Sequence, residues 1–135
     1  MKVFADTNVL VSAVIFPGST PEAFYRLALE GRIELVSSRP LLAELGRVLT
    51  EKFGWEPERA EEAVGQVVRL AEIVTPREAL SEIEADAADN RVLEAAAEGG
   101  AGAIVSGDRH LLALGSWRGI EIQSPAAFIE RHGTR

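Results

Sequence analysis

The feature that most constrains this chain is a short apolar segment that ends at polar and acidic residues and occurs twice. Residues 3–5 (VFA) lead directly into Asp6, and residues 103–105 (AIV) are followed closely by Asp108. Short apolar runs bounded by polar residues are typical of buried β-strands. In open parallel α/β sheets, ligands bind beyond the carboxyl ends of the strands. We therefore expect both aspartates to lie at the ligand-binding edge of one sheet.

Helix and strand patterns alternate along the rest of the chain. They predict helices over about residues 9–16, 20–30, 40–53, 57–70, 88–97 and 125–131, a short helix from about 109, and further strands near 33–36, 73–74 and 120–122. Strands separated by helices need crossover connections, which favour a mainly parallel sheet covered by helices. We expect a three-layer α/β/α sandwich with a mainly parallel central sheet, with residues 1–135 forming one domain.

Composition excludes several kinds of site. The chain of 135 residues has no cysteine, so disulfides, thiolate zinc sites and thiol nucleophiles are excluded. His110 and His132 are the only histidines, which makes a histidine-built metal site an unfavoured hypothesis. A net charge of −7 argues against a nucleic-acid partner, unless an acidic cluster that binds cations accounts for much of that charge.

The length of the apolar segments indicates where in the cell the protein is expected. No apolar run reaches the length of a membrane span, and Met1-Lys2 leads straight into a strand instead of a signal peptide. We expect a cytoplasmic protein with no membrane association.

Two helical acids are predicted to lean toward the same sheet edge. Glu44 lies on the border of the apolar face of its helix, although Lys52 falls within that face and makes it imperfect. Asp89 lies in line with the apolar stripe of its helix, in the first turn. Together with Asp6 and Asp108, these residues are consistent with one shared pocket.

Each acid also has a simpler interpretation. Asp6 and Asp108 follow strands and precede helices, where Asp commonly serves as an N-cap. Asp89 can complement a helix dipole, with Asp86 as the cap, and Glu44 can lie on a solvated face. Four carboxylates in one pocket would repel one another and resist ionisation, and a divalent cation would remove that conflict.

Oxygen ligands alone favour Mg²⁺ or Mn²⁺. The chemistry that fits such a site is hydrolysis of a phosphodiester, with one ion activating water and a second stabilising the leaving oxygen. Asn8 and Ser106 offer neutral groups that can orient a bound water or a phosphate oxygen, and Thr7 can do the same or bond to the backbone.

Three blocks of sequence carry a family resemblance. Residues 3–13 (VFADTNVLVSA), 88–96 (ADNRVLEAA) and 104–112 (IVSGDRHLL) resemble, in order and spacing, the three blocks of the PIN-domain ribonucleases. Within that family the chain looks most like the VapC-like toxins of toxin–antitoxin pairs. Relatives often carry a denser acidic block before the third acid, where this chain has Asp86 and Asp89 separated by two alanines.

The resemblance implies both a site and an activity. It matches Asp6, Glu44, Asp89 and Asp108 to the four catalytic, metal-binding acids of the family, and Asn8 and Ser106 to the small polar positions beside them. It implies a compact α/β/α fold and a metal-dependent endoribonuclease that acts on RNA. It further implies an antitoxin protein as partner and a homodimer.

Several alternatives remain beside this hypothesis. A phosphatase of the haloacid dehalogenase type needs a second Asp two residues after its nucleophile, where this chain has Asn8. A receiver-like signalling module needs a late lysine, but the only lysines are Lys2 and Lys52. A non-toxin RNA-processing nuclease and a non-catalytic RNA- or protein-binding relative also stay open, and retention of all four acids argues against the latter.

Contacts with RNA are weakly indicated by the sequence. Arg91, Arg109 and His110 lie beside the third and fourth acids, where they can bind phosphates or form structural ion pairs. Trp55 and Trp117 can stack on bases or be buried in a core or an interface.

Overall fold

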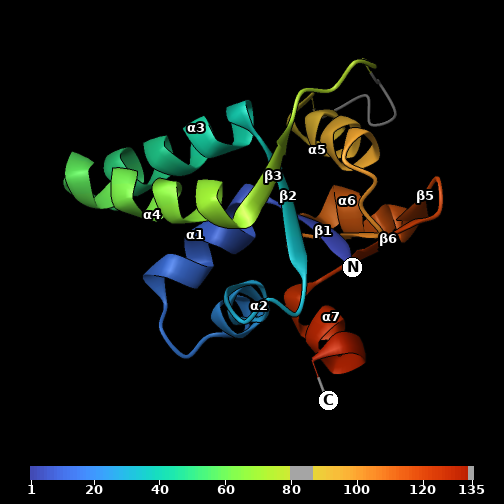
Figure 1. Ribbon diagram of the computed structural model, residues 1–135, viewed down its shortest axis with the longest axis horizontal. Helices are drawn as coiled ribbons and strands as arrows, with labels where there is room; N and C mark the ends of the chain where they lie inside the picture. The colour runs from blue at the N-terminus through green and yellow to red at the C-terminus, as the bar shows by residue number, and fades with distance from the viewer. Residues whose placement is uncertain (80–86, 134–135) are drawn as a thin grey trace.

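The computed structural model describes residues 1–79 and 87–133 (Figure 1). The strands are β1 (Lys2–Ala5), β2 (Glu34–Ser38), β3 (Ala71–Val74), β4 (Ala103–Val105), β5 (Ser116–Trp117) and β6 (Ile120–Gln123). The helices are α1 (Thr7–Ile15), α2 (Thr20–Leu29), α3 (Arg39–Arg47), α4 (Pro57–Leu70), α5 (Ala87–Glu98), α6 (Arg109–Leu114) and α7 (Pro125–His132). A π-helical segment, η1 (Val48–Lys52), continues α3.

The described strands form one sheet in the order β3-β2-β1-β4-β6-β5. The pairs β1–β2, β1–β4, β2–β3 and β4–β6 are parallel, and the short β5 pairs antiparallel with β6. In Figure 1, α5 lies above the sheet and α2 and α7 lie below it. The predicted fold class, an α/β/α sandwich with a mainly parallel sheet, is confirmed.

The centre of the sheet is a topological switch point. From β1 the chain continues through α1 and α2 to β2 on one side, and from β4 it continues through α6 to β6 on the other. Connections that leave neighbouring strands in opposite directions open a crevice at their carboxyl ends. The Asp6 backbone N–H donates to the Val105 carbonyl (2.9 Å), which holds this end of β1 against β4.

Burial explains why β1 and β4 are nearly uniform apolar runs. Residues 3–5 and 103–105 are at most 1% exposed, because helices cover both faces of the central strands. The layer below the sheet is closed by the Phe24 and Phe128 rings of α2 and α7, which meet edge to face with centroids 5.4 Å apart.

Two local features differ from the sequence prediction. The helix expected over residues 40–53 changes at Val48 from α-helical to π-helical hydrogen bonding, so that the Phe53 N–H donates to the Val48 carbonyl (3.3 Å). The strand β5 was not predicted, because two residues are too few to show an alternating pattern. The expected cap Asp86 lies outside the described residues.

The other predicted elements are present within a few residues of their expected bounds. Within residues 1–79 and 87–133, no helix combines the length and the apolar character that a membrane span requires.

Candidate metal centre

One cavity of about 580 Å³ brings together all four predicted acids at the carboxyl edge of the sheet. Asp6 follows β1, Glu44 lies on α3, Asp89 lies in the first turn of α5, and Asp108 lies between β4 and α6. Their elements are far apart in sequence and meet here because β1 and β4 are neighbours at the switch point. The geometry therefore supports the predicted shared pocket.

Asp6 is both a helix cap and a cavity residue. Its Oδ1 accepts a hydrogen bond from the Thr7 N–H (2.8 Å) at the start of α1. Its Oδ2 accepts from the Ser106 hydroxyl (2.7 Å) and from the Asn8 side-chain amide (3.3 Å). The side chain is only 9% exposed. The Asp6 carboxylate thus both caps α1 and lines the cavity.

The surroundings of Asp6 disfavour its charge. Burial raises the pKa of the Asp6 carboxyl, hydrogen bonds from Ser106 and Thr7 lower it, and the nearby charges of Asp108 and Glu44 raise it, with a net upward shift. A carboxylate in this position gains from a cation that offsets both burial and repulsion.

Asp108 repeats the arrangement in a more open setting. Its Oδ1 accepts from the backbone N–H groups of His110 (2.8 Å) and Leu111 (3.1 Å), which caps α6. Partial burial raises the pKa of the Asp108 carboxyl. A hydrogen bond with Asp89, the two backbone hydrogen bonds and the charge of His110 lower this pKa by more than burial raises it, so the net shift is downward. Asp108 is therefore ionised more readily than Asp6.

Ser106 connects these two aspartates through hydrogen bonds. Its hydroxyl donates to Asp6 Oδ2 and accepts from the Asp108 backbone N–H (2.9 Å), and the residue is fully buried. The sequence prediction gave Ser106 a role in orienting a bound water or phosphate. In the structure the Ser106 hydroxyl donates its proton to Asp6, and Ser106 is not among the described residues that line the cavity. Ser106 therefore positions Asp6.

Thr7 is a second positioning residue, which the sequence did not reveal as such. Its hydroxyl donates to Glu44 Oε1 at 2.6 Å, across 37 positions of sequence. This contact fixes the α3 carboxylate relative to the end of β1. From the sequence, a water, a phosphate or the backbone was expected as the partner of Thr7, because no local pattern pairs it with Glu44.

Asn8 lies at the exposed mouth of the site. Its amide nitrogen donates to Asp6, and its carbonyl oxygen accepts from the Gly107 N–H (3.2 Å). The side chain thus ties the loop after β4 to the start of α1 while lining the cavity.

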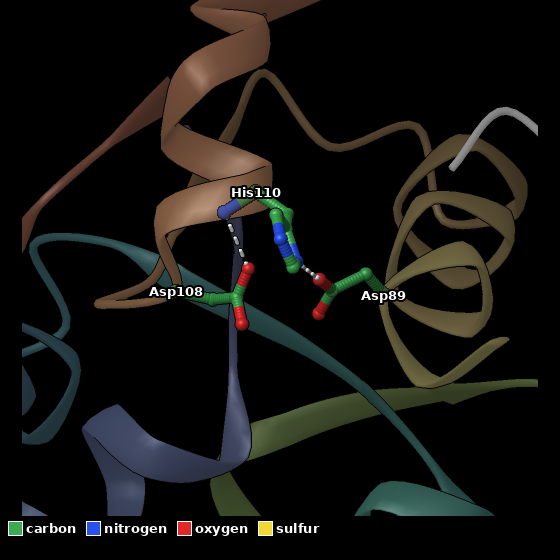
Figure 2. A group of neighbouring side chains, drawn as sticks. All are labelled: Asp89, Asp108 and His110. Carbon is green, nitrogen blue, oxygen red and sulfur yellow. Dashed lines mark hydrogen bonds and ion pairs between the residues drawn. The ribbon is translucent and has the colours of Figure 1, made fainter. Parts of the chain in front are cut away.

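Asp89 extends from α5 toward Asp108 and His110, as Figure 2 shows. Ligand atoms of these three residues lie within 4.8 Å of one another, and His110 Nδ1 is 3.9 Å from Asp89 Oδ2. Asp89 is only 5% exposed, although its side chain is a carboxylic acid. His110 thus borders the acid cluster, whereas only phosphate binding or ion pairing was expected of it from the sequence.

The remaining predicted contact residues are distributed differently. Arg91 lines the cavity and forms an ion pair with Glu94 (2.5 Å), and Arg109 is exposed outside it. Trp55 and Trp117 are partly buried, each beneath an arginine. The lining residues that were not predicted to belong to the site include Arg47, Lys52 and Phe53.

The donor set fits a hard divalent cation. Four carboxylates supply oxygen ligands only, and the one imidazole lies at the border of the cluster. Oxygen-rich sites of this kind suit Mg²⁺ and Mn²⁺ better than metals that prefer thiolate or several imidazoles. Neighbouring carboxylates also raise the pKa of Asp6, a repulsion that a bound cation would relieve.

Comparison with known proteins identifies the family of this chain. The sequence model of the PIN domain matches residues 2–110, a range that includes all four acids. Among solved structures, the chain is similar to a chain of the crystal structure of VapBC2 from Rickettsia felis bound to a DNA fragment from their promoter. The TM-score is 0.65 at 16% identity, over 92% of this chain and 98% of that chain. A search of curated proteins gave no match. Since the domain match covers most of its length, this chain belongs to the PIN domain family.

Proposed function

We propose that this protein is a metal-dependent endoribonuclease whose catalytic, metal-binding residues are Asp6, Glu44, Asp89 and Asp108. The observation that carries the proposal is the convergence of these four carboxylates, from four separate elements, in one cavity at the switch point. Membership of the PIN domain family, a family of nucleases, supports hydrolysis of a nucleic-acid phosphodiester as the reaction.

The four acids would hold Mg²⁺ or Mn²⁺, which supplies Lewis-acid activation of water and neutralises charge on the phosphate. The protein contributes the placement of the ligands. Ser106 holds Asp6, and Thr7 holds Glu44, each through a hydrogen bond shorter than 2.8 Å. Asn8 lines the cavity mouth, where its amide is placed to orient water or a phosphate oxygen.

We further propose that the protein is the toxin of a type II toxin–antitoxin pair. The support is the likeness of its fold to a chain of the VapBC2 complex. The proposal includes RNA as substrate, a protein antitoxin as partner, a homodimer and a cytoplasmic location. Induced expression should arrest growth, and a small protein encoded beside it should restore growth. Light scattering of the purified protein tests the dimer.

The direct test is cleavage of RNA by purified protein with Mg²⁺, Mn²⁺ or EDTA. We expect cleavage of a fluorescent single-stranded RNA with either metal and none with EDTA. Asp89→Ala should reduce the rate more than about 100-fold, because loss of groups that merely support ligands already costs about 10–100-fold. Glu62→Ala on the exposed face of α4 is the matched control and should cleave normally.

The same experiment separates the competing enzyme class. Protein that hydrolyses p-nitrophenyl phosphate but leaves RNA intact with both metals would establish a phosphatase instead. Full activity of Asp89→Ala would show that the third acid has been assigned to the wrong residue. A folded protein that binds RNA without cleaving it would be a non-catalytic relative, and RNA cleavage without growth arrest would favour an RNA-processing nuclease.

A further inference from the structure

The cavity continues beyond the acids to a second group of side chains at the end of α3 and in η1. We propose that Arg47, Lys52 and Phe53, here called the basic arm, bind single-stranded RNA beside the phosphodiester that is cleaved. In this assignment the two cations hold backbone phosphates and the Phe53 ring stacks on an unpaired base. The inference rests on the proposed function, because it names how the substrate of that site is held.

Charge is the first observation that supports the basic arm. Arg47 and Lys52 line the same cavity as the four acids, in a chain with a net charge of −7. Among the residues that the structure describes, no carboxylate lies within ion-pair distance of either side chain. By contrast, Arg91 in the same cavity is paired with Glu94. Two cations left without carboxylate partners in an acidic protein are suited to an anionic ligand.

The helix geometry places the basic arm next to the catalytic acids. Arg47 and Lys52 follow Glu44 by three and eight residues, so they extend along the same side of the helix. Arg47 lies about 4.5 Å along the helix axis from Glu44 at an α-helical rise of about 1.5 Å per residue, and Lys52 lies at the end of the π-helical segment that follows. This order is suited to a strand whose cleaved phosphate lies at the acids and whose neighbouring nucleotides lie along α3 and η1.

The π-helical segment explains why Lys52 and Phe53 reach the cavity. In this segment the Phe53 N–H donates to the Val48 carbonyl, and just beyond it the Trp55 N–H donates to the carbonyl of Leu49, whose side chain is fully buried. The wider turn changes the direction of the side chains that follow, and such segments are frequent at functional sites. Lys52 interrupts the apolar face that the sequence predicts for this helix, and in the structure it lines the cavity.

The exposure and position of Phe53 also support the basic arm. Its side chain is 40% exposed and forms part of the cavity wall beside Lys52. An aromatic face in a cleft that also presents cations is the usual combination for binding single-stranded nucleic acid, since every base can stack. Stacking on Phe53 requires an unpaired base, which favours a single strand over a duplex. An acidic protein segment would match the cations, but it would not account for their place beside four catalytic carboxylates.

Binding is tested in the Asp108→Asn protein, where cleavage is removed, by anisotropy of a fluorescent RNA 12-mer. Arg47→Gln and Lys52→Gln should each weaken binding and reduce the slope of log affinity against log salt by about 0.7, the value for one phosphate contact in a single strand. Phe53→Leu should weaken binding about tenfold, as expected for loss of one stacked base. Arg69→Gln and Phe16→Leu are the matched controls, since both residues are exposed and lie outside the described cavity lining.

Cleavage by the active protein provides the second measurement. Each basic-arm variant should raise KM for single-stranded RNA about tenfold with kcat nearly unchanged, since stacking and phosphate contacts of this kind act in binding. A hairpin that pairs every base near the cleaved bond should be a poor substrate for wild type and equally poor for Phe53→Leu. Circular dichroism checks that each variant is folded.

The outcomes distinguish this inference from the proposed function. If wild type cleaves RNA and the three variants bind and cleave it as the controls do, the basic arm does not contact RNA and the inference is wrong. That result would instead point to a protein segment over this surface. If no RNA is cleaved but the basic-arm variants still lose binding and salt dependence, the inference holds and the catalytic assignment fails.

Discussion

Asp6 and Asp108 occupy the same local motif, yet their surroundings differ in one decisive respect. Each follows a central parallel strand, caps the next helix and lines the same cavity. Asp6 is 9% exposed and its pKa is raised, chiefly by burial, whereas hydrogen bonds at the more open Asp108 hold its pKa below the usual value. The motif therefore places a carboxylate, and the tertiary neighbours decide how readily it ionises.

This difference has a consequence for metal binding. The Asp6 carboxylate is the less stable of the two in the protein without metal, so it has more to gain from a cation. Ser106 joins them, because its hydroxyl donates to Asp6 and accepts from the backbone of Asp108. The two aspartates thus differ in the direction of their pKa shifts, and both are held by the same Ser106 hydroxyl.

The largest expected effect is one that the two aspartates share. Asp6→Asn and Asp108→Asn should each lower metal-dependent RNA cleavage by more than about 100-fold, because the proposed function makes both residues catalytic metal ligands, and such a ligand matters at least as much as the groups that support it. Both proteins should stay folded, since Asn also caps helices well. Rates and circular dichroism spectra measure the two expectations. Substantial activity in either variant would remove that aspartate from the ligand set.

A somewhat smaller loss is expected for the residues that hold the acids. Ser106→Ala and Thr7→Val should each lower activity about 10–100-fold, the usual effect of removing a hydrogen bond that orients a metal ligand. Thr20→Val at the exposed start of α2 serves as the control. The apparent metal affinity, measured by titration, should fall in parallel with the rate. A normal metal affinity with a low rate would show that these hydroxyls act on the substrate instead.

Stability without metal should separate the two aspartates. Because the folded-state pKa of Asp6 is raised, its contribution to stability is present below the ordinary value of 3.8 and is lost as pH rises through the folded-state pKa. Asp6→Asn should therefore raise the melting temperature at pH 7.5 in EDTA.

Asp108 should show the opposite dependence. Its folded-state pKa is lowered, so its ionised form stabilises the protein above the ordinary value, and that contribution is lost as pH falls through the folded-state pKa. Asp108→Asn should give no gain in melting temperature in EDTA at pH 7.5. Calorimetry from pH 3 to 8 checks both signs. Equal responses of the two variants would mean that burial of Asp6 does not govern its ionisation.

The smallest effect is expected at His110, which borders the acid cluster beside Asp108 and Asp89. His110→Gln removes the imidazole that lies 3.9 Å from Asp89 Oδ2 and leaves the backbone cap of α6 in place. We expect a loss of activity of about tenfold or less, at the low end for groups that support ligands. A loss as large as that of Asp108→Asn would make His110 a ligand, which metal titration would reveal as a matching drop in affinity.

Much of the fold followed from local patterns. Val3 to Ala5 and the run before Ser106 are apolar because both faces of the central strands are buried. Helix α4 was predicted with its observed bounds because its apolar residues recur at helical spacing, opposite a charged face. Strand β5 and the π-helical turn were not predicted. The hydrogen bonds of β5 depend on pairing with β6, and neither a two-residue strand nor a single π-helical turn leaves a periodic signal in the sequence.

The sequence by itself determined where the four acids fall on their elements: Asp6 and Asp108 after strands, Glu44 and Asp89 toward the apolar sides of helices. Hydrophobic periodicity is a local property, so it is legible in a single chain. The tertiary structure alone decided that Thr7 holds Glu44, that Ser106 holds Asp6, and that Asp6 and Asp108 have opposite pKa shifts. These properties arise from burial and from contacts across as many as 100 positions, because the parallel pairing of β1 with β4 brings distant residues to one edge.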